Sequence, residues 1–129
     1  MYVKFNPNPL ASNVGDCVIR AVSLATGSSW EETYIALANL GLELRDMPSA
    51  NHVWGEYLRR NGFVRKTLPN TCPTCYTVSD FTRDHPIGLY VLASGSHTVT
   101  ALNGNFYDSW DSGNETVAYY WEKEFNDVL

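Results

Sequence analysis

The chain has 129 residues, and its 44% hydrophobic and 18% charged residues suit one globular domain, residues 1–129, rather than a disordered segment. The formal net charge is −5, and only one small group of basic residues occurs, Arg59, Arg60, Arg65 and Lys66, so nucleic acid is not expected as a partner. No apolar stretch approaches the roughly 20 residues that span a bilayer, no signal sequence opens the chain, and the cysteine count of three is odd. We therefore expect a cytoplasmic protein with reduced thiols and no membrane partner.

Helical patterns occupy the first two thirds of the chain. Residues 1–14 are expected to be irregular because of Pro7 and Pro9. The first helix is apolar on nearly every side, which is typical of a buried central helix. Gly41 is expected to end the second helix. The predicted helices cover about residues 16–25, 29–40 and 50–61, with a short one from about residue 77 that ends before Pro86.

The hydrophobic period changes to two after residue 88, which indicates strands. The predicted strands cover residues 89–93, 97–102, 106–110 and 116–121, and Asn103-Gly104 is a strong hairpin signal. Helices followed by consecutive antiparallel strands predict an α+β fold with a sheet of about four strands.

Cys17 lies at the start of the first predicted helix, where unpaired backbone N–H groups and the helix dipole favour a thiolate. His97 begins one strand and Asp108 lies on the next. A cysteine, a histidine and an acid in these places predict a nucleophile, its general base and the residue that orients the base.

The hairpin register supports the pairing of His97 with Asp108. A two-residue turn at Asn103-Gly104 puts both on one face together with Val99 and Phe106, and this face is otherwise apolar. The opposite face, with Thr98 and Thr100, is expected to meet solvent. A buried carboxylate is costly unless it is paired, and the imidazole is the partner within reach.

Two alternatives remain open at this hairpin. A three-residue turn with a bulge would reverse the parity and favour Asp111 over Asp108. Trp110 faces His97 in the predicted register, where it would shield the ion pair or line a substrate cleft.

Cys72 and Cys75 form a C-x-x-C spacing, which is found in zinc sites and in redox dithiols. A structural zinc site needs four ligands and this motif supplies two. Two ordinary cysteines in a turn are the preferred interpretation, so we expect no metal and no other cofactor.

Residues 15–21, Gly-Asp-Cys-Val-Ile-Arg-Ala, resemble the nucleophile segment of papain-like cysteine peptidases, most of all the ovarian-tumour-type deubiquitinases and the peptidases that cut bacteriocin leaders. Residues 96–99, Ser-His-Thr-Val, and Asp108 resemble the rest of the catalytic set. These segments are about a fifth of the chain, and the whole chain is similar to a small protein family of Gram-positive bacteria and their phages. The resemblance implies a papain-like fold, with Cys17 as nucleophile, His97 as base and acid, and Asp108 as the orienting residue.

One position departs from that family. Many papain-like enzymes have an oxyanion-binding glutamine six residues before the cysteine, where this chain has Ala11. The Asn13 side chain and the Cys17 backbone N–H could replace it, or the loop backbone could do so, as in the deubiquitinase branch.

The expected function is therefore hydrolysis of a peptide or isopeptide bond in a peptide or protein substrate. Two alternatives stay open: an acyl transferase that uses the same triad, and a papain-like binding module with little or no catalysis, such as a phage protein that engages a host factor. The oligomeric state is not predicted.

Overall fold

The computed structural model describes residues 1–124, so the last part of the predicted domain, residues 125–129, lies outside the described residues. Helices and strands form an α+β fold, as the sequence predicts. In chain order the elements are β1 (Tyr2–Lys4), α1 (Cys17–Thr26), α2 (Trp30–Leu44), α3 (Asn51–Arg60), β2 (Phe63–Thr67), α4 (Val78–Asp84), β3 (Leu89–Ala93), β4 (Thr98–Leu102), β5 (Asn105–Asp108) and β6 (Tyr119–Lys123).

The strands form one mixed sheet of six strands in the order β1-β5-β4-β3-β6-β2. β1 runs parallel to β5, and the other neighbours are antiparallel. The expectation of about four antiparallel strands is wrong at both edges of the sheet. β1 has only three residues, and in β2 only Phe63 is buried, so neither edge strand carries an alternating apolar pattern.

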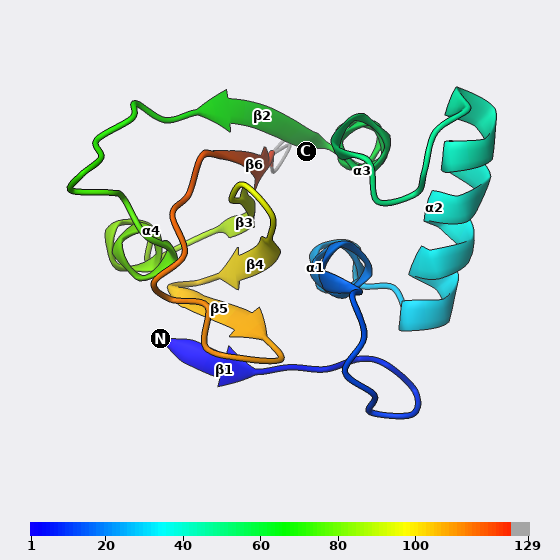
Figure 1. The fold of residues 1–129 in the computed structure, drawn as a ribbon, viewed down its shortest axis with the longest axis horizontal. Helices are drawn as coiled ribbons and strands as arrows, with labels where there is room; N and C mark the ends of the chain where they lie inside the picture. The colour runs from blue at the N-terminus through cyan, green and yellow to red at the C-terminus, as the bar shows by residue number, and fades with distance from the viewer. Residues whose placement is uncertain (125–129) are drawn as a thin grey trace, which may run out of the picture.

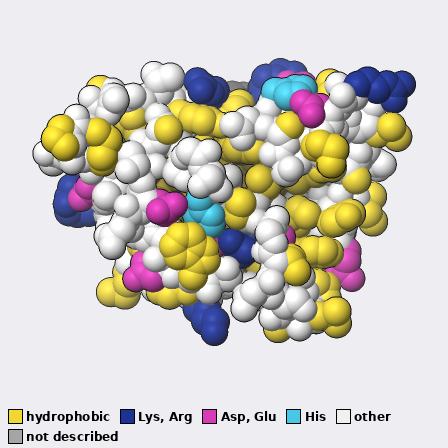
Figure 2. All heavy atoms as spheres, in the orientation of Figure 1, with side chains coloured by type: hydrophobic (Ala, Val, Ile, Leu, Met, Phe, Trp, Pro, Cys, Tyr) yellow, Lys and Arg dark blue, Asp and Glu magenta, His cyan; other side chains and the backbone are white. Residues whose placement is uncertain are grey.

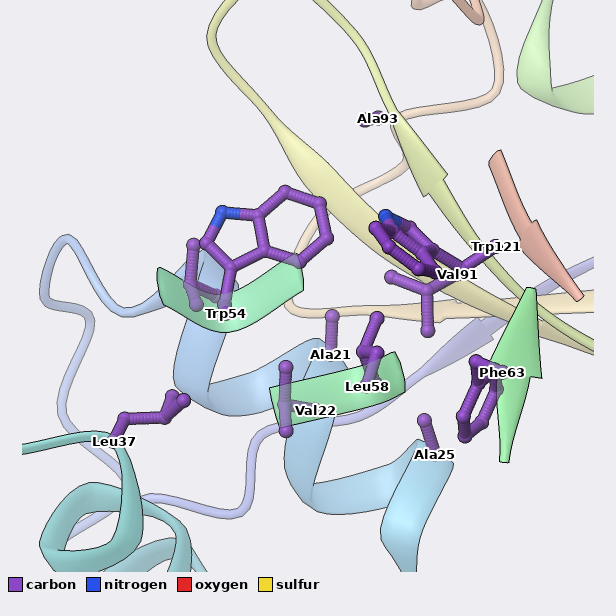
Figure 3. Packing of buried hydrophobic residues seen from close by; sticks show 11 residues of the cluster. Ala21, Val22, Ala25, Leu37, Trp54, Leu58, Phe63, Val91, Ala93 and Trp121 are labelled. Carbon is purple, nitrogen blue, oxygen red and sulfur yellow. The ribbon is translucent and has the colours of Figure 1, made fainter. Parts of the chain in front are cut away.

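Helices cover both faces of the sheet. Figure 1 shows α1 and α3 on one side with α2 outside them, and α4 on the opposite side. The larger core lies between α1, α3 and the sheet, where Val22, Trp54 and Leu58 meet Val91. Figure 3 shows these side chains converging around α1. The expectation that the first helix is buried and central is confirmed.

The second helix begins as expected but ends later. Ser29 and Glu32 form a reciprocal capping box at its start. Gly41 does not end the helix: it lies inside α2, and a Cβ there would come within 2.7 Å of the Asp46 carbonyl oxygen. Gly41 therefore makes room for the chain that returns toward α3.

The hairpin has the predicted register, with Thr100 opposite Tyr107 and Ala101 opposite Phe106. The expectation that the threonine face meets solvent is wrong. Thr98 and Thr100 are buried, and Thr100 Oγ1 donates a hydrogen bond of 2.6 Å to the Ala21 carbonyl oxygen of α1. A threonine can lie in the core here because a helix carbonyl satisfies its hydroxyl.

The three cysteines differ in state. Cys72 and Cys75 form a disulfide, so the expectation of reduced thiols is wrong for this pair, while Cys17 is free. Among residues 1–124, no group of histidine, cysteine, aspartate and glutamate side chains is arranged to hold a metal ion. None of the described helices has the length and apolar character needed to cross a bilayer.

Candidate active site

Asp108 is the centre of a buried polar network at the end of β5. Its Oδ2 lies 2.6 Å from His97 Nε2 and accepts a second hydrogen bond of 2.6 Å from Ser112 Oγ. Its Oδ1 accepts 2.8 Å from the Ser109 backbone N–H. The side chain is fully buried, and both carboxylate oxygens have hydrogen-bond partners, so the carboxylate is satisfied without water.

Arg20 connects this carboxylate to α1. Its Nη2 lies 2.9 Å from Asp108 Oδ1, and its Nη1 lies 2.6 Å from Asp16 Oδ1. Asp16 Oδ2 in turn accepts a hydrogen bond of 2.9 Å from Trp30 Nε1 at the start of α2. Arg20 and Asp16 are both buried, so one guanidinium lies between two carboxylates that have almost no solvent contact. The network ties the start of α1 to the end of β5.

Cys17 is the first residue of α1 and is half-buried. Burial acts to raise the pKa of its thiol, but hydrogen bonds from the His97 side chain and the Thr98 backbone, with the nearby charges of His97 and Arg20, outweigh burial and lower that pKa. A lowered thiol pKa increases the fraction of thiolate, the reactive form of cysteine.

The pKa of the His97 imidazole shifts in the opposite direction. Burial acts to lower the pKa of His97, but its hydrogen bonds to Asp108 and Cys17 and their charges raise that pKa from 6.5 to about 9. The pKa of Asp108 is lowered, because contacts with His97, Ser112 and Arg20 outweigh the effect of burial. The three shifts favour the charged form of each group: a Cys17 thiolate, a His97 imidazolium and an Asp108 carboxylate.

A cleft of about 430 Å³ opens in front of these groups. Cys17, Arg20 and His97 lie in its wall, as do Asn13 and Trp110. Near the middle of the face in Figure 2, a histidine lies beside acidic and hydrophobic side chains and close to a Lys or Arg side chain. Cys17 is therefore accessible from solvent through this cleft.

The loop that carries Asn13 is held by local hydrogen bonds. Asn6 Nδ2 donates to the Ser12 carbonyl oxygen (3.2 Å), and Asn8 Oδ1 accepts from the Leu10 backbone N–H (2.9 Å). Ala11 has a φ of 53°, the left-handed conformation that favours glycine. The loop thus places Asn13, two residues after Ala11, at the cleft.

The structure shows which of the two candidate aspartates, Asp108 or Asp111, contacts His97. Asp111 Oδ1 accepts 3.0 Å from the Gly113 backbone N–H, while Asp108 contacts His97. Trp110 lies beyond the end of β5, is 46% exposed, and has its ring centroid 4.8 Å from that of His97. Trp110 therefore both covers the imidazole and lines the cleft.

Sequence reasoning missed Arg20, Asp16 and Ser112. A signal for Arg20 was present, because it is the one charged side chain among the residues of α1, a helix apolar on nearly every side. A charge in such a helix needs a buried partner of opposite sign.

Comparison with known proteins finds no matching family model, no matching curated protein and no matching solved structure.

Proposed function

We propose that this protein is a papain-like cysteine hydrolase that cleaves a peptide or isopeptide bond with Cys17, His97 and Asp108. The observation that carries the proposal is the position of the imidazole. His97 Nε2 bonds the buried Asp108 carboxylate, which leaves Nδ1 as the ring nitrogen for the Cys17 thiol. An acid that fixes the tautomer of a histidine beside a nucleophile is the arrangement of a catalytic triad.

The reaction follows in two steps. The Cys17 thiolate attacks the carbonyl carbon and forms a C–S bond; the C–N bond then breaks as the His97 imidazolium gives its proton to the leaving amine. In the second step, His97 takes a proton from water, the hydroxide attacks the thioester carbonyl, and the acid product leaves with the thiolate restored. Acyl transfer differs only in that an amine replaces the water.

We infer two donors for the oxyanion that forms in both steps. The N–H of Cys17 belongs to the first turn of α1, where backbone donors have no partner inside the helix. The Asn13 side chain lies in the same cleft wall and supplies a second donor. Removal of one such donor commonly costs about 10²–10³ in kcat.

Arg20 supports this chemistry through Asp108. The guanidinium neutralises part of the carboxylate charge, so Asp108 can stay buried and ionised next to His97. Arg20 is therefore a positioning residue.

We also propose a peptide or protein substrate and a cytoplasmic location. The Cys72–Cys75 disulfide does not support this location, because disulfides persist mainly in oxidising compartments.

Alkylation of Cys17 tests the proposal directly. Without reductant, Cys72 and Cys75 are protected by their disulfide, so iodoacetamide reports on Cys17 alone. We expect a rate that is half-maximal well below pH 8, a strong loss of this reactivity in His97→Ala, and no change in the matched variant His52→Ala, whose histidine is exposed and pairs with Asp46.

A panel of quenched peptide and amide substrates, run with wild type and Cys17→Ala, then measures turnover. An ordinary thiol pH profile that His97→Ala leaves unchanged would refute the triad. An activated thiol without turnover on any substrate would favour the binding module instead.

A further inference from the structure

The one basic group in the sequence takes no part in the active site; its members are Arg59, Arg60, Arg65 and Lys66. Three of the four have carboxylate partners, which are Glu56 for both arginines of α3 and Glu122 for Lys66. Arg65 forms no ion pair within residues 1–124, and its guanidinium carbon lies 4.1 Å from the centre of the Tyr119 ring. The aromatic ring leaves the positive charge of Arg65 available to a ligand.

A groove of about 380 Å³ lies beside Arg65, between α3 and the strands β2 and β6. Gly55 and Arg59 of α3 line it, as do Tyr119 and Trp121 of β6. Arg65 and Trp121 are opposite each other in the β2–β6 register, so their side chains lie on the same face of the sheet. We call this space the α3 groove. It shares no lining residue with the catalytic cleft.

Trp121 brings a buried hydrogen-bond donor to the α3 groove. The residue is 9% exposed, and its Nε1–H has no acceptor in the part of the chain that the structure describes. A Cβ built on Gly55 would lie 2.9 Å from Cζ2 and 3.7 Å from Cε2 of the indole, so the ring edge that carries Nε1 faces the groove wall. Buried polar groups in native proteins are nearly always paired. An acceptor that enters the groove beside Gly55 would satisfy this donor.

The chemistry of the α3 groove favours a carboxylate. Its two oxygens can accept from the Arg65 guanidinium and from the Trp121 N–H. A flat base finds little aromatic surface to stack on, because the Tyr119 ring already lies under Arg65 and stacks with Trp54. A phosphate dianion fits less well, because the Glu56 carboxylate lies in the same wall and repels a second negative charge.

The position of β2 favours a peptide as the carrier of this carboxylate. β2 is the last strand of the sheet, and no described strand pairs with its outer side (Figure 1). Its residues 64–67 are exposed. An edge strand presents backbone N–H and C=O groups with which a second extended chain can pair. Every second side chain of such a chain would point toward the face that carries the α3 groove.

We propose that an acidic peptide segment of a partner protein pairs with β2 as an added strand and places a carboxylate in the α3 groove, where Arg65 and the Nε1–H of Trp121 bind it. The partner strand carries an acidic residue between uncharged ones, because Glu56 and Glu122 lie nearby and disfavour further negative charge. This site is separate from Cys17, and the inference does not depend on the proposed function.

Nuclear magnetic resonance of isotope-labelled protein tests the inference at Trp121 itself. The chain has four tryptophans, so four indole N–H signals are expected, and Trp121→Phe identifies the one from Trp121. The probes are the peptide acetyl-Thr-Val-Glu-Val-Thr-amide, its glutamine counterpart and succinate. We expect the glutamate peptide to move the Trp121 signal and to bind at least about tenfold more tightly than the glutamine peptide. Succinate should bind more weakly than the glutamate peptide, since it cannot pair with β2.

Two exposed arginines supply matched variants, because Arg65 lines the α3 groove and Arg83 does not. Arg65→Gln should lower the affinity for the glutamate peptide about tenfold, to the level of the glutamine peptide, whereas Arg83→Gln should leave it unchanged. The indole signals of Trp30 and Trp110, which lie outside the groove, should stay in place and so show that both variants are folded.

Three results would overturn the inference. Equal affinity for the glutamate and glutamine peptides would exclude a carboxylate site, and a Trp121 signal that no probe moves would exclude the α3 groove. Succinate that binds as tightly as the glutamate peptide would exclude the added strand. Iodoacetamide reports on Cys17 in the catalytic cleft, so the proposed function stands or fails by a separate measurement.

Discussion

Replacing Arg20 with methionine removes the guanidinium that lies between Asp16 and Asp108 while keeping a long apolar side chain. The two carboxylates are 5% and 0% exposed, so water cannot replace the lost contacts. Removing one partner of a buried ion pair costs about 3–5 kcal/mol. For 129 residues the entropy of unfolding is about 0.27 kcal/mol/K, so the melting temperature should fall by about 11–18 °C.

The loss of stability in Arg20→Met should also depend on pH. Together with His97 and Ser112, Arg20 lowers the pKa of Asp108, so the stability that this carboxylate contributes in wild type is present above about pH 4 and is lost as pH falls below it. Without the guanidinium the pKa of Asp108 is less lowered, so Arg20→Met loses less stability on acidification. The difference in melting temperature between the two proteins should therefore narrow below about pH 4.

Circular dichroism melts at pH 7 and at about pH 3 measure the loss of stability and its dependence on pH. Arg20→Lys keeps the positive charge but not the planar guanidinium that contacts both carboxylates, so its melting temperature should lie between those of wild type and Arg20→Met. Arg83→Met removes an exposed arginine that also contacts two aspartates, and should shift the midpoint by less than about 2 °C. An Arg20→Met variant that melts within about 2 °C of wild type, or a deficit that is the same at both pH values, would refute the reasoning.

Two further predictions concern stability. In wild type, the raised pKa of His97 and the lowered pKa of Cys17 act on stability with opposite dependence on pH. In Cys17→Ala the contribution of Cys17 to the His97 pKa is lost, and the contact with Asp108 still raises that pKa. The free energy of unfolding of this variant should therefore fall as pH rises above about 6.5, while that of wild type changes less; urea titrations measure both. Gly55→Ala places a Cβ within 2.9 Å of Trp121 Cζ2, and it should lower the free energy of unfolding by about 1–2 kcal/mol after its gain in helix propensity is counted. The control Gly95→Ala, whose Cβ meets no atom within 4 Å, should leave urea unfolding unchanged. Equal stability of the two variants would contradict the packing argument.

The hairpin shows how far sequence pattern can reach. Asn103-Gly104 determines the turn, and the turn determines the register of β4 and β5. The expectation that His97 and Asp108 share a face with Val99 and Phe106 is wrong. Val99 and Phe106 pack with residues of α4, whereas Asp108 bonds Arg20 of α1, and His97 reaches Asp108 from the segment before β4. Which face of β4 meets α1 could not be predicted in the same way. Thr100 looks solvent-exposed by polarity, and its burial depends on the Ala21 carbonyl, which belongs to an element 79 residues away.

The sequence pattern gives less information about the two edge strands and the disulfide than about the hairpin. Four of the five residues of β2 are exposed, so no alternation marks the strand. Cys72 and Cys75 are compatible with a thiol pair, a metal site or a disulfide, and spacing alone does not choose among these. Gly41 carried a terminator signal because glycine is common after helices, while its role here is a close approach by a distant backbone.

The separation of Cys17 from its partners along the chain has a consequence during protein synthesis. Residue 17 leaves the ribosome long before residues 97 and 108 are joined to the chain. Until then the thiol has neither the imidazole nor the Thr98 backbone that lower its pKa, and it stays an ordinary cysteine. Activation thus coincides with completion of the native hairpin, so that a nascent or unfolded chain carries no activated thiol to react with surrounding proteins.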